Sequence, residues 1–125
     1  MMTGFRPPRA LLMVLVALCL SPPAFAAERF LSVIEDLPLM PGLEEISGSA
    51  IIFSRPQGRI VEVAASGAMA ERDVLSFYRR TLPGLGWQRT RPRHWRREGE
   101  QLILGLRSDA VGLVVQFSLA PDDGQ

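Results

Sequence analysis

Five arginines between residues 89 and 97 are the strongest chemical signal in this sequence, and two tryptophans and the single histidine lie beside them. Guanidinium groups bind phosphates and carboxylates in bidentate fashion and stack on aromatic rings. We therefore expect contact with an anionic envelope surface or an acidic envelope protein. The residues expected to make this contact are Arg89, Arg91, Arg93 and Arg96. The alternative is a solvated hairpin face with Trp95 in the core and the charge balanced by Glu98 and Glu100.

Residues that could catalyse a reaction or hold a metal are scarce. His94 is the only histidine, and no serine or cysteine nucleophile lies near it in the sequence. A metal site needs several ligands, and the carboxylates lack the spacing of a calcium loop. We therefore expect no enzyme, no metal and no cofactor. The alternative is a small periplasmic enzyme with a non-standard site around His94 and a nearby carboxylate.

The first 26 residues predict the compartment in which the protein works. Arg6 and Arg9 precede an apolar run of 11 residues, 10–20, and the triplet Ala24-Phe25-Ala26 follows it. A basic region, an apolar region and an A-x-A site describe a cleaved secretory signal peptide. The apolar run is shorter than the ~20 residues that span a bilayer, so we expect no transmembrane span after cleavage. The sequence predicts a periplasmic or secreted protein.

The composition of the chain that would remain after cleavage at Ala26 indicates one small domain without cysteine. The remaining 99 residues are the size of one small domain, and they contain no cysteine because Cys19 lies in the leader. Loss of two arginines leaves 12 basic against 13 acidic residues, a net charge of −1. A near-neutral domain has no global field that attracts nucleic acid, so we expect no nucleic-acid partner. The fold must be held by apolar packing without disulfides.

Residues 27–47 predict an extended apolar strap laid against the core. Pro38 and Pro41 forbid a continuous helix or a central strand, and Pro41-Gly42 fits the two middle positions of a type II turn. The leucines and methionine of residues 37–43 are poor choices for a solvated loop. Two alternatives are a floppy N-terminal linker and an exposed docking edge for a partner protein.

Residues 70–82 carry the clearest helical signal. Four apolar residues fall at positions i, i+3, i+4 and i+8, a stripe broad enough to dock on a sheet. These residues are Val74, Phe77, Tyr78 and Leu82. Acids in the first turn and arginines in the last turn favour the helix dipole. We expect Pro83-Gly84 to end the helix.

Strand patterns surround this helix in a domain expected to span residues 48–120, before a polar tail at 121–125. The expected strands are 49–54, 59–65, 87–90, 93–97, 101–107 and 113–119. Short spacings with tight turns favour antiparallel pairing. The predicted order is β-β-α-β-β-β-β, an α+β fold in which a single helix packs on one face of an antiparallel sheet.

Two motifs carry a resemblance to a known group of proteins. They are DLPLMPGLEE at residues 36–45 and FYRRTLPGLGW at residues 77–87. In the order strap, hairpin, helix, Gly-Trp strand and meander, the chain resembles small exported α+β proteins of the α-proteobacterial type. The resemblance implies an exported α+β domain and brings no catalytic residue with it.

The function that these observations favour is a non-enzymatic binding or accessory module of the bacterial cell envelope. The expectation rests on the absence of a nucleophile–base pair or a metal-ligand set from the sequence pattern. Two alternatives stay open, namely the small enzyme around His94 and a structural subunit of an envelope complex.

Overall fold

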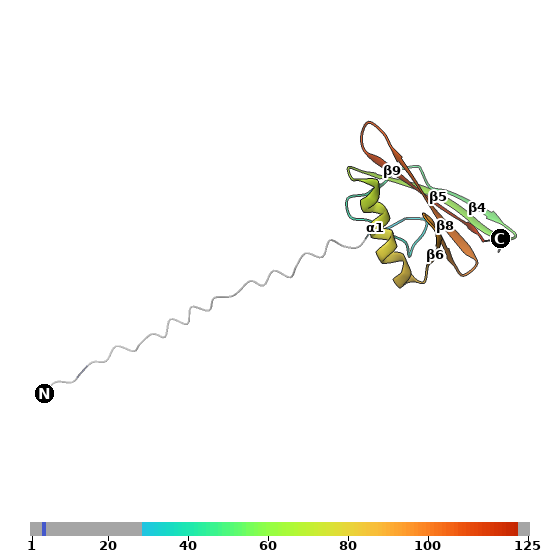
Figure 1. Ribbon diagram of the computed structural model, residues 1–125, viewed down its shortest axis with the longest axis horizontal. Coiled ribbons are helices and arrows are strands. Elements are labelled where there is room, and N and C mark those ends of the chain that lie inside the picture. The colour runs from blue at the N-terminus through green and yellow to red at the C-terminus, as the bar shows by residue number, and fades with distance from the viewer. Residues whose placement is uncertain (1–3, 5–28, 123–125) are drawn as a thin grey trace.

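The computed structural model describes Gly4 and residues 29–122. The expected leader, its cleavage site and the last three residues of the polar tail lie outside the described residues. The described chain forms one α-helix, one 3-10 helix and nine strands (Figure 1).

A seven-stranded antiparallel sheet forms most of the domain. Its strands are β3 (Glu44–Glu45), β4 (Ile51–Arg55), β5 (Gly58–Gly67), β6 (Gln88–Arg91), β7 (His94–Arg97), β8 (Glu100–Ser108) and β9 (Leu113–Pro121). They follow the order β3-β5-β9-β8-β7-β6, and β4 pairs with the same edge of β5 as β3 does. The α+β class is confirmed, and β4 to β9 with the helix match the predicted element order.

The N-terminal strap contributes three short strands that the sequence pattern did not predict. Strand β1 (Arg29–Phe30) pairs with β2 (Pro38–Leu39), and β3 pairs with the end of β5. The expected turn is present, because the Leu43 N–H donates to the Met40 carbonyl at 3.0 Å and Gly42 has a φ of 96°. The strap also supplies buried side chains to the core, namely Leu31, Ile34, Leu37, Leu39 and Leu43.

The helix α1 (Glu71–Thr81) packs on the sheet through the predicted stripe. Val74, Tyr78 and the following Leu82 are fully buried. The α-helix ends at Thr81, just before Pro83-Gly84, as expected, and a 3-10 turn, η1 (Leu82–Leu85), follows it. A proline in the first turn of a helix loses no hydrogen bond, so the short 3-10 turn accommodates Pro83. The 3-10 turn ends at Gly86, whose φ of 91° reverses the chain toward β6.

The core lies between the sheet and the layer made by α1 and the strap. Alternate residues of the two central strands face this layer, namely Val61, Val63, Ala65, Val115, Phe117 and Leu119. The residues between them lie on the opposite, open face, where Gln116 and Ser118 are half-buried. Figure 1 shows α1 on one side of the sheet, with β4 at the far edge. One face of the sheet is therefore covered by the chain itself.

Tyr78 connects the helix to the strap. Its hydroxyl donates to the Pro38 carbonyl at 2.8 Å and accepts from the Met40 N–H at 3.2 Å. Its ring makes edge-to-face contacts with Phe77 and Phe117, with centroids 5.0 and 5.5 Å apart. Burial raises the pKa of Tyr78 well above its ordinary value because the charged phenolate loses its hydration.

We expect this tyrosine, the only one in the chain, to ionise only as the protein unfolds at alkaline pH. The pKa of Tyr78 in the folded protein lies above its value of ~10 in the unfolded chain. The contribution of Tyr78 to the free energy of unfolding is therefore fully present below pH ~10 and is lost as the pH rises further. Tyr78→Phe should flatten this alkaline loss and cost about 1–3 kcal/mol at neutral pH, because two buried backbone groups lose their partner. Phenolate absorbance followed together with circular dichroism checks the coupling. Ionisation at the ordinary pKa in a folded protein would contradict it.

Candidate functional site

The structure separates the four arginines expected to act together. In the register of β6 and β7, Arg91 lies opposite His94 and Arg96 lies opposite Gln88. These residues lie on the open face of the sheet. Arg89 lies opposite the buried Trp95 and so belongs to the face that α1 covers. A bulge between Arg89 and Arg91 produces this change of side.

Two of the four arginines have carboxylate partners within the chain. Arg93, in the turn between β6 and β7, pairs with Glu71 at the start of α1. Arg96 pairs with Asp122. Such partly exposed pairs contribute about 0–1 kcal/mol each, but they reduce the charge that the hairpin presents. For Arg89 and Arg91, which are exposed, residues 29–122 provide no ion pair.

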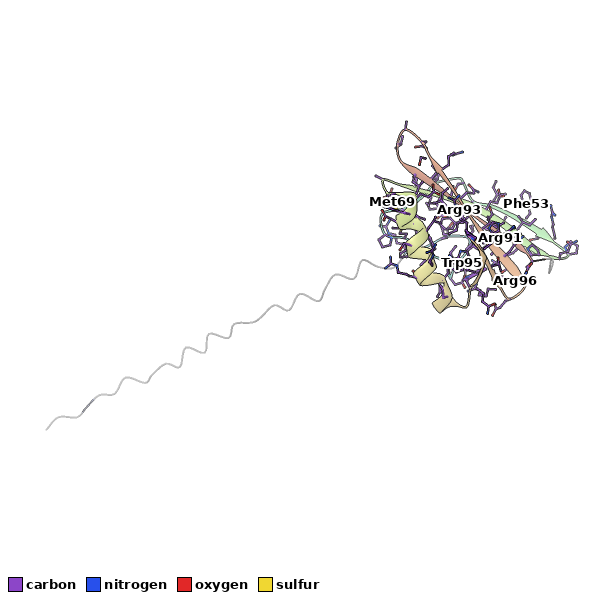
Figure 2. The ribbon with its side chains drawn as sticks, in the orientation of Figure 1. Phe53, Met69, Arg91, Arg93, Trp95 and Arg96 are labelled. Carbon is purple, nitrogen blue, oxygen red and sulfur yellow. The ribbon has the colours of Figure 1, made fainter. Side chains whose placement is uncertain are left out.

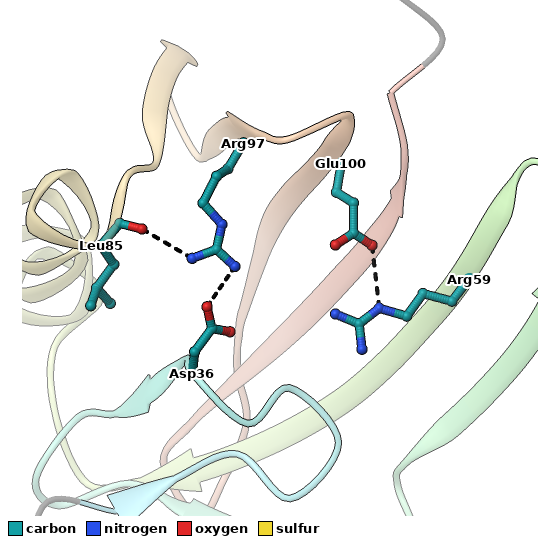
Figure 3. A network of polar contacts seen from close by, with 5 residues as sticks. All are labelled: Asp36, Arg59, Leu85, Arg97 and Glu100. Atoms are coloured by element: carbon teal, nitrogen blue, oxygen red, sulfur yellow. Dashed lines mark hydrogen bonds and ion pairs between the residues drawn. The ribbon is translucent and has the colours of Figure 1, made fainter.

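Arg97 has a structural role that sequence reasoning missed. Its guanidinium lies 2.6 Å from an Asp36 carboxylate oxygen and donates to the Leu85 carbonyl at 3.0 Å (Figure 3). It also sits 4.4 Å from the Trp87 ring centroid. The Trp87 indole N–H beneath it is buried and has no acceptor within the described chain. The strap, η1 and β7 are therefore held together by one arginine at the expected strand end.

Two further residues of the hairpin region lie apart from any common site. Glu100, expected to balance the arginine cluster, instead pairs with Arg59 of β5 at 3.3 Å (Figure 3). His94 is half-buried, and its Nδ1 lies 2.9 Å from the Pro92 carbonyl, so this nitrogen donates the hydrogen bond. Among the described residues, no group of three or more histidine, cysteine or acidic side chains could hold a metal ion.

An apolar groove lies between the strap, the end of α1 and the β8–β9 loop. Its volume is about 1220 Å³. Residues that form its wall and remain partly or largely exposed include Leu85, at 38%, and Val111, at 90%. Other apolar lining residues are Phe30, Leu39, Met40, Leu43, Ile46, Phe77 and Leu113. Such a concave, mostly apolar surface is typical of binding sites for small molecules.

Two glycines bring the backbones of the groove wall into close contact. A Cβ atom on Gly67, at the end of β5, would lie 2.5 Å from the Gly42 carbonyl oxygen. A Cβ atom on Gly112 would lie 2.7 Å from the Gly67 carbonyl oxygen. The strap turn, β5 and the β8–β9 loop can therefore meet only because no side chain separates them.

The polar groups of the groove are engaged in holding the fold. The Thr81 hydroxyl donates to the Phe77 carbonyl at 2.7 Å. The Asp109 carboxylate accepts from the N–H groups of Val111 and Gly112 at 2.8 and 3.0 Å, which shapes the β8–β9 loop. Arg29 and Glu44 add one charge of each sign to the lining. The arrangement offers apolar contact area with a few charged groups.

The fold and this groove define a small α+β domain with an apolar groove on its surface. No family model, curated protein or solved structure matches the sequence. Within the part of the chain that the structure describes, no helix has the length and hydrophobicity needed to cross a bilayer.

Proposed function

We propose that this protein is a non-enzymatic binding module of the bacterial cell envelope that binds the acyl chain of an amphipathic molecule in the groove. The observation that carries the proposal is the groove of about 1220 Å³, whose wall includes four apolar side chains that stay exposed, namely Phe30, Ile46, Leu85 and Val111. Covering such surface contributes about 25 cal/mol for each Å² of apolar area removed from water. An elongated acyl chain fits an open groove bounded by three separate segments.

The expected leader supports a location where acyl chains are abundant. A cleaved signal peptide would deliver the domain to the periplasm or the exterior, where lipids of the envelope are the commonest amphipathic molecules. The charged residues Arg29 and Glu44 among the lining can face a polar head group. Contact of the arginine hairpin with an anionic surface stays a separate prediction.

A fluorescence titration tests the proposal. The neutral fluorophore phenylnaphthylamine should brighten on binding, and laurate should displace it. The double variant Leu85→Asp/Val111→Asp should weaken both ligands at least about tenfold, or about 1.4 kcal/mol, because two carboxylates would enter the apolar wall. Both side chains are exposed, so the core is left intact.

Matched controls separate the groove from other surfaces. Ile51→Asp makes the same kind of change at an exposed residue of β4, outside the groove, and should leave the affinity for laurate unchanged. The double variant Arg91→Gln/Arg96→Gln should also bind normally. Equal binding by the groove variant and the wild type would remove the groove from the account, as would loss of binding in the arginine variant alone.

A further inference from the structure

Strand β4 is an apolar edge strand with an unpaired side. It pairs with β5 along Ile51–Arg55, and among residues 29–122 no strand pairs with its other edge. All five residues are exposed, and Ile52 and Phe53 reach 55% and 58%. An exposed edge presents a row of free N–H and C=O groups that can pair with another strand. Figure 2 places Phe53 at the side of the sheet away from Met69.

The opposite edge of the sheet is protected against such pairing. Strand β6 has only four residues, two of them arginines, and a bulge interrupts its register between Arg89 and Arg91. Charged side chains, short length and bulges are the usual means of blocking edge pairing. In β4 a regular five-residue register runs without a bulge, and its single charge, Arg55, stands at the end. The two edges therefore differ in whether they can accept a strand.

We propose that β4 pairs antiparallel with β4 of a second copy of this chain, which joins two sheets across a two-fold axis. A symmetric pairing centred on Phe53 uses all five residues, whereas other registers leave part of the strand unpaired. It sets Phe53 against the partner's Phe53 and Ile51 against the partner's Arg55. Aromatic and aliphatic cross-strand pairs of this kind stabilise sheets.

Charge complementarity favours this partner and this register. Ile51 pairs with Glu62 of β5, and Ile51, Arg55 and Glu62 all lie on the open face of the sheet. Neighbouring strands are ~4.8 Å apart, so the partner's Arg55 would lie about 10 Å, or two strands, from Glu62. The long arginine and glutamate side chains can close that distance. The two-fold axis creates the ion pair twice, and within one chain Arg55 and Glu62 lie at opposite ends of the hairpin register.

Sedimentation velocity over a range of concentrations tests the interface. The wild-type protein should form dimers, and Phe53→Lys should abolish them while circular dichroism stays unchanged. Arg55→Glu and Glu62→Arg should each weaken dimerisation about tenfold through like-charge repulsion. The double variant Arg55→Glu/Glu62→Arg should restore it to within about threefold of the wild type. Recovery of dimerisation in the double variant would indicate a direct contact between residues 55 and 62 across the interface.

Cross-linking provides a second measurement that does not depend on affinity. In a Cys19→Ser background, Phe53→Cys should form a disulfide-linked dimer under mild oxidation, because paired Cα atoms of a ladder lie within disulfide range. Thr90→Cys on the edge strand β6 is the matched control and should stay monomeric. A wild-type protein that is monomeric at every soluble concentration would overturn the proposal. Dimers that persist in the Phe53→Lys variant would also overturn it, as would failure of the Arg55→Glu/Glu62→Arg double variant to restore dimerisation. None of these results bears on ligand binding in the groove.

Discussion

Trp87→Ala is expected to lower the free energy of unfolding by about 3–5 kcal/mol, the usual cost of emptying a buried aromatic site. Trp87 is 2% exposed, and its backbone N–H donates to the Leu82 carbonyl at the point where η1 gives way to β6. Its ring also contacts the Arg97 guanidinium, which forms an ion pair with Asp36 of the strap. Loss of the ring should therefore loosen the strap as well as open a cavity. Chemical denaturation followed by circular dichroism measures the change.

Trp87→Phe is the matched control for this substitution. It keeps most of the apolar volume and removes the buried indole N–H, which has no acceptor in the described chain. We expect it to cost less than about 1.5 kcal/mol, since relief of an unsatisfied donor offsets part of the lost packing. An alanine variant no less stable than the phenylalanine variant would show that the ring does not close the core.

Gly67→Ala is expected to destabilise the protein by about 1–3 kcal/mol or more, because the new methyl group would overlap a backbone atom. The added Cβ would lie 2.5 Å from the Gly42 carbonyl oxygen and 3.0 Å from the Met69 Cε. Met69 can move, but the carbonyl belongs to the Pro41-Gly42 turn. The strap must therefore shift, which should also reduce laurate binding in the adjacent groove. Unfolding curves and the fluorophore titration measure the two effects.

Gly105→Ala provides the comparison that isolates this close approach. Gly105 lies in strand β8, and a Cβ atom there would meet Gln116 Cβ at 3.4 Å, an ordinary contact. Replacing glycine by alanine where the backbone conformation allows it usually stabilises a protein by ~0.4–1 kcal/mol. Equal stability of the two alanine variants would contradict the steric account of Gly67.

The sequence was most informative where side chains repeat with a regular period. The spacing of Val74, Tyr78 and Leu82 predicted the buried face of α1, and alternation in residues 113–119 predicted the inward face of β9. The Pro41-Gly42 turn also followed from local backbone chemistry. In contrast, strands β1, β2 and β3 have two residues each, which is too short for a period to show.

The candidate site depends on contacts between distant segments, which no local pattern reports. Arg97 and Asp36 are 61 positions apart, and nothing in either neighbourhood indicates their ion pair. The groove wall joins Gly67 and Gly112, whose role is to leave space for a neighbouring backbone. Conversely, the arginine run looked like one cluster because sequence proximity conceals the bulge that places Arg89 on the other face.

The most direct test of the central claim is to map the laurate contact by nuclear magnetic resonance on nitrogen-labelled protein. Binding in the groove predicts amide shift changes centred on the strap turn at Met40–Leu43, the end of the helical segment at Thr81–Leu85 and the loop at Val111–Leu113. Shift changes confined to the arginine hairpin of β6 and β7, or no changes at saturating laurate, would contradict the claim that the groove is the binding site.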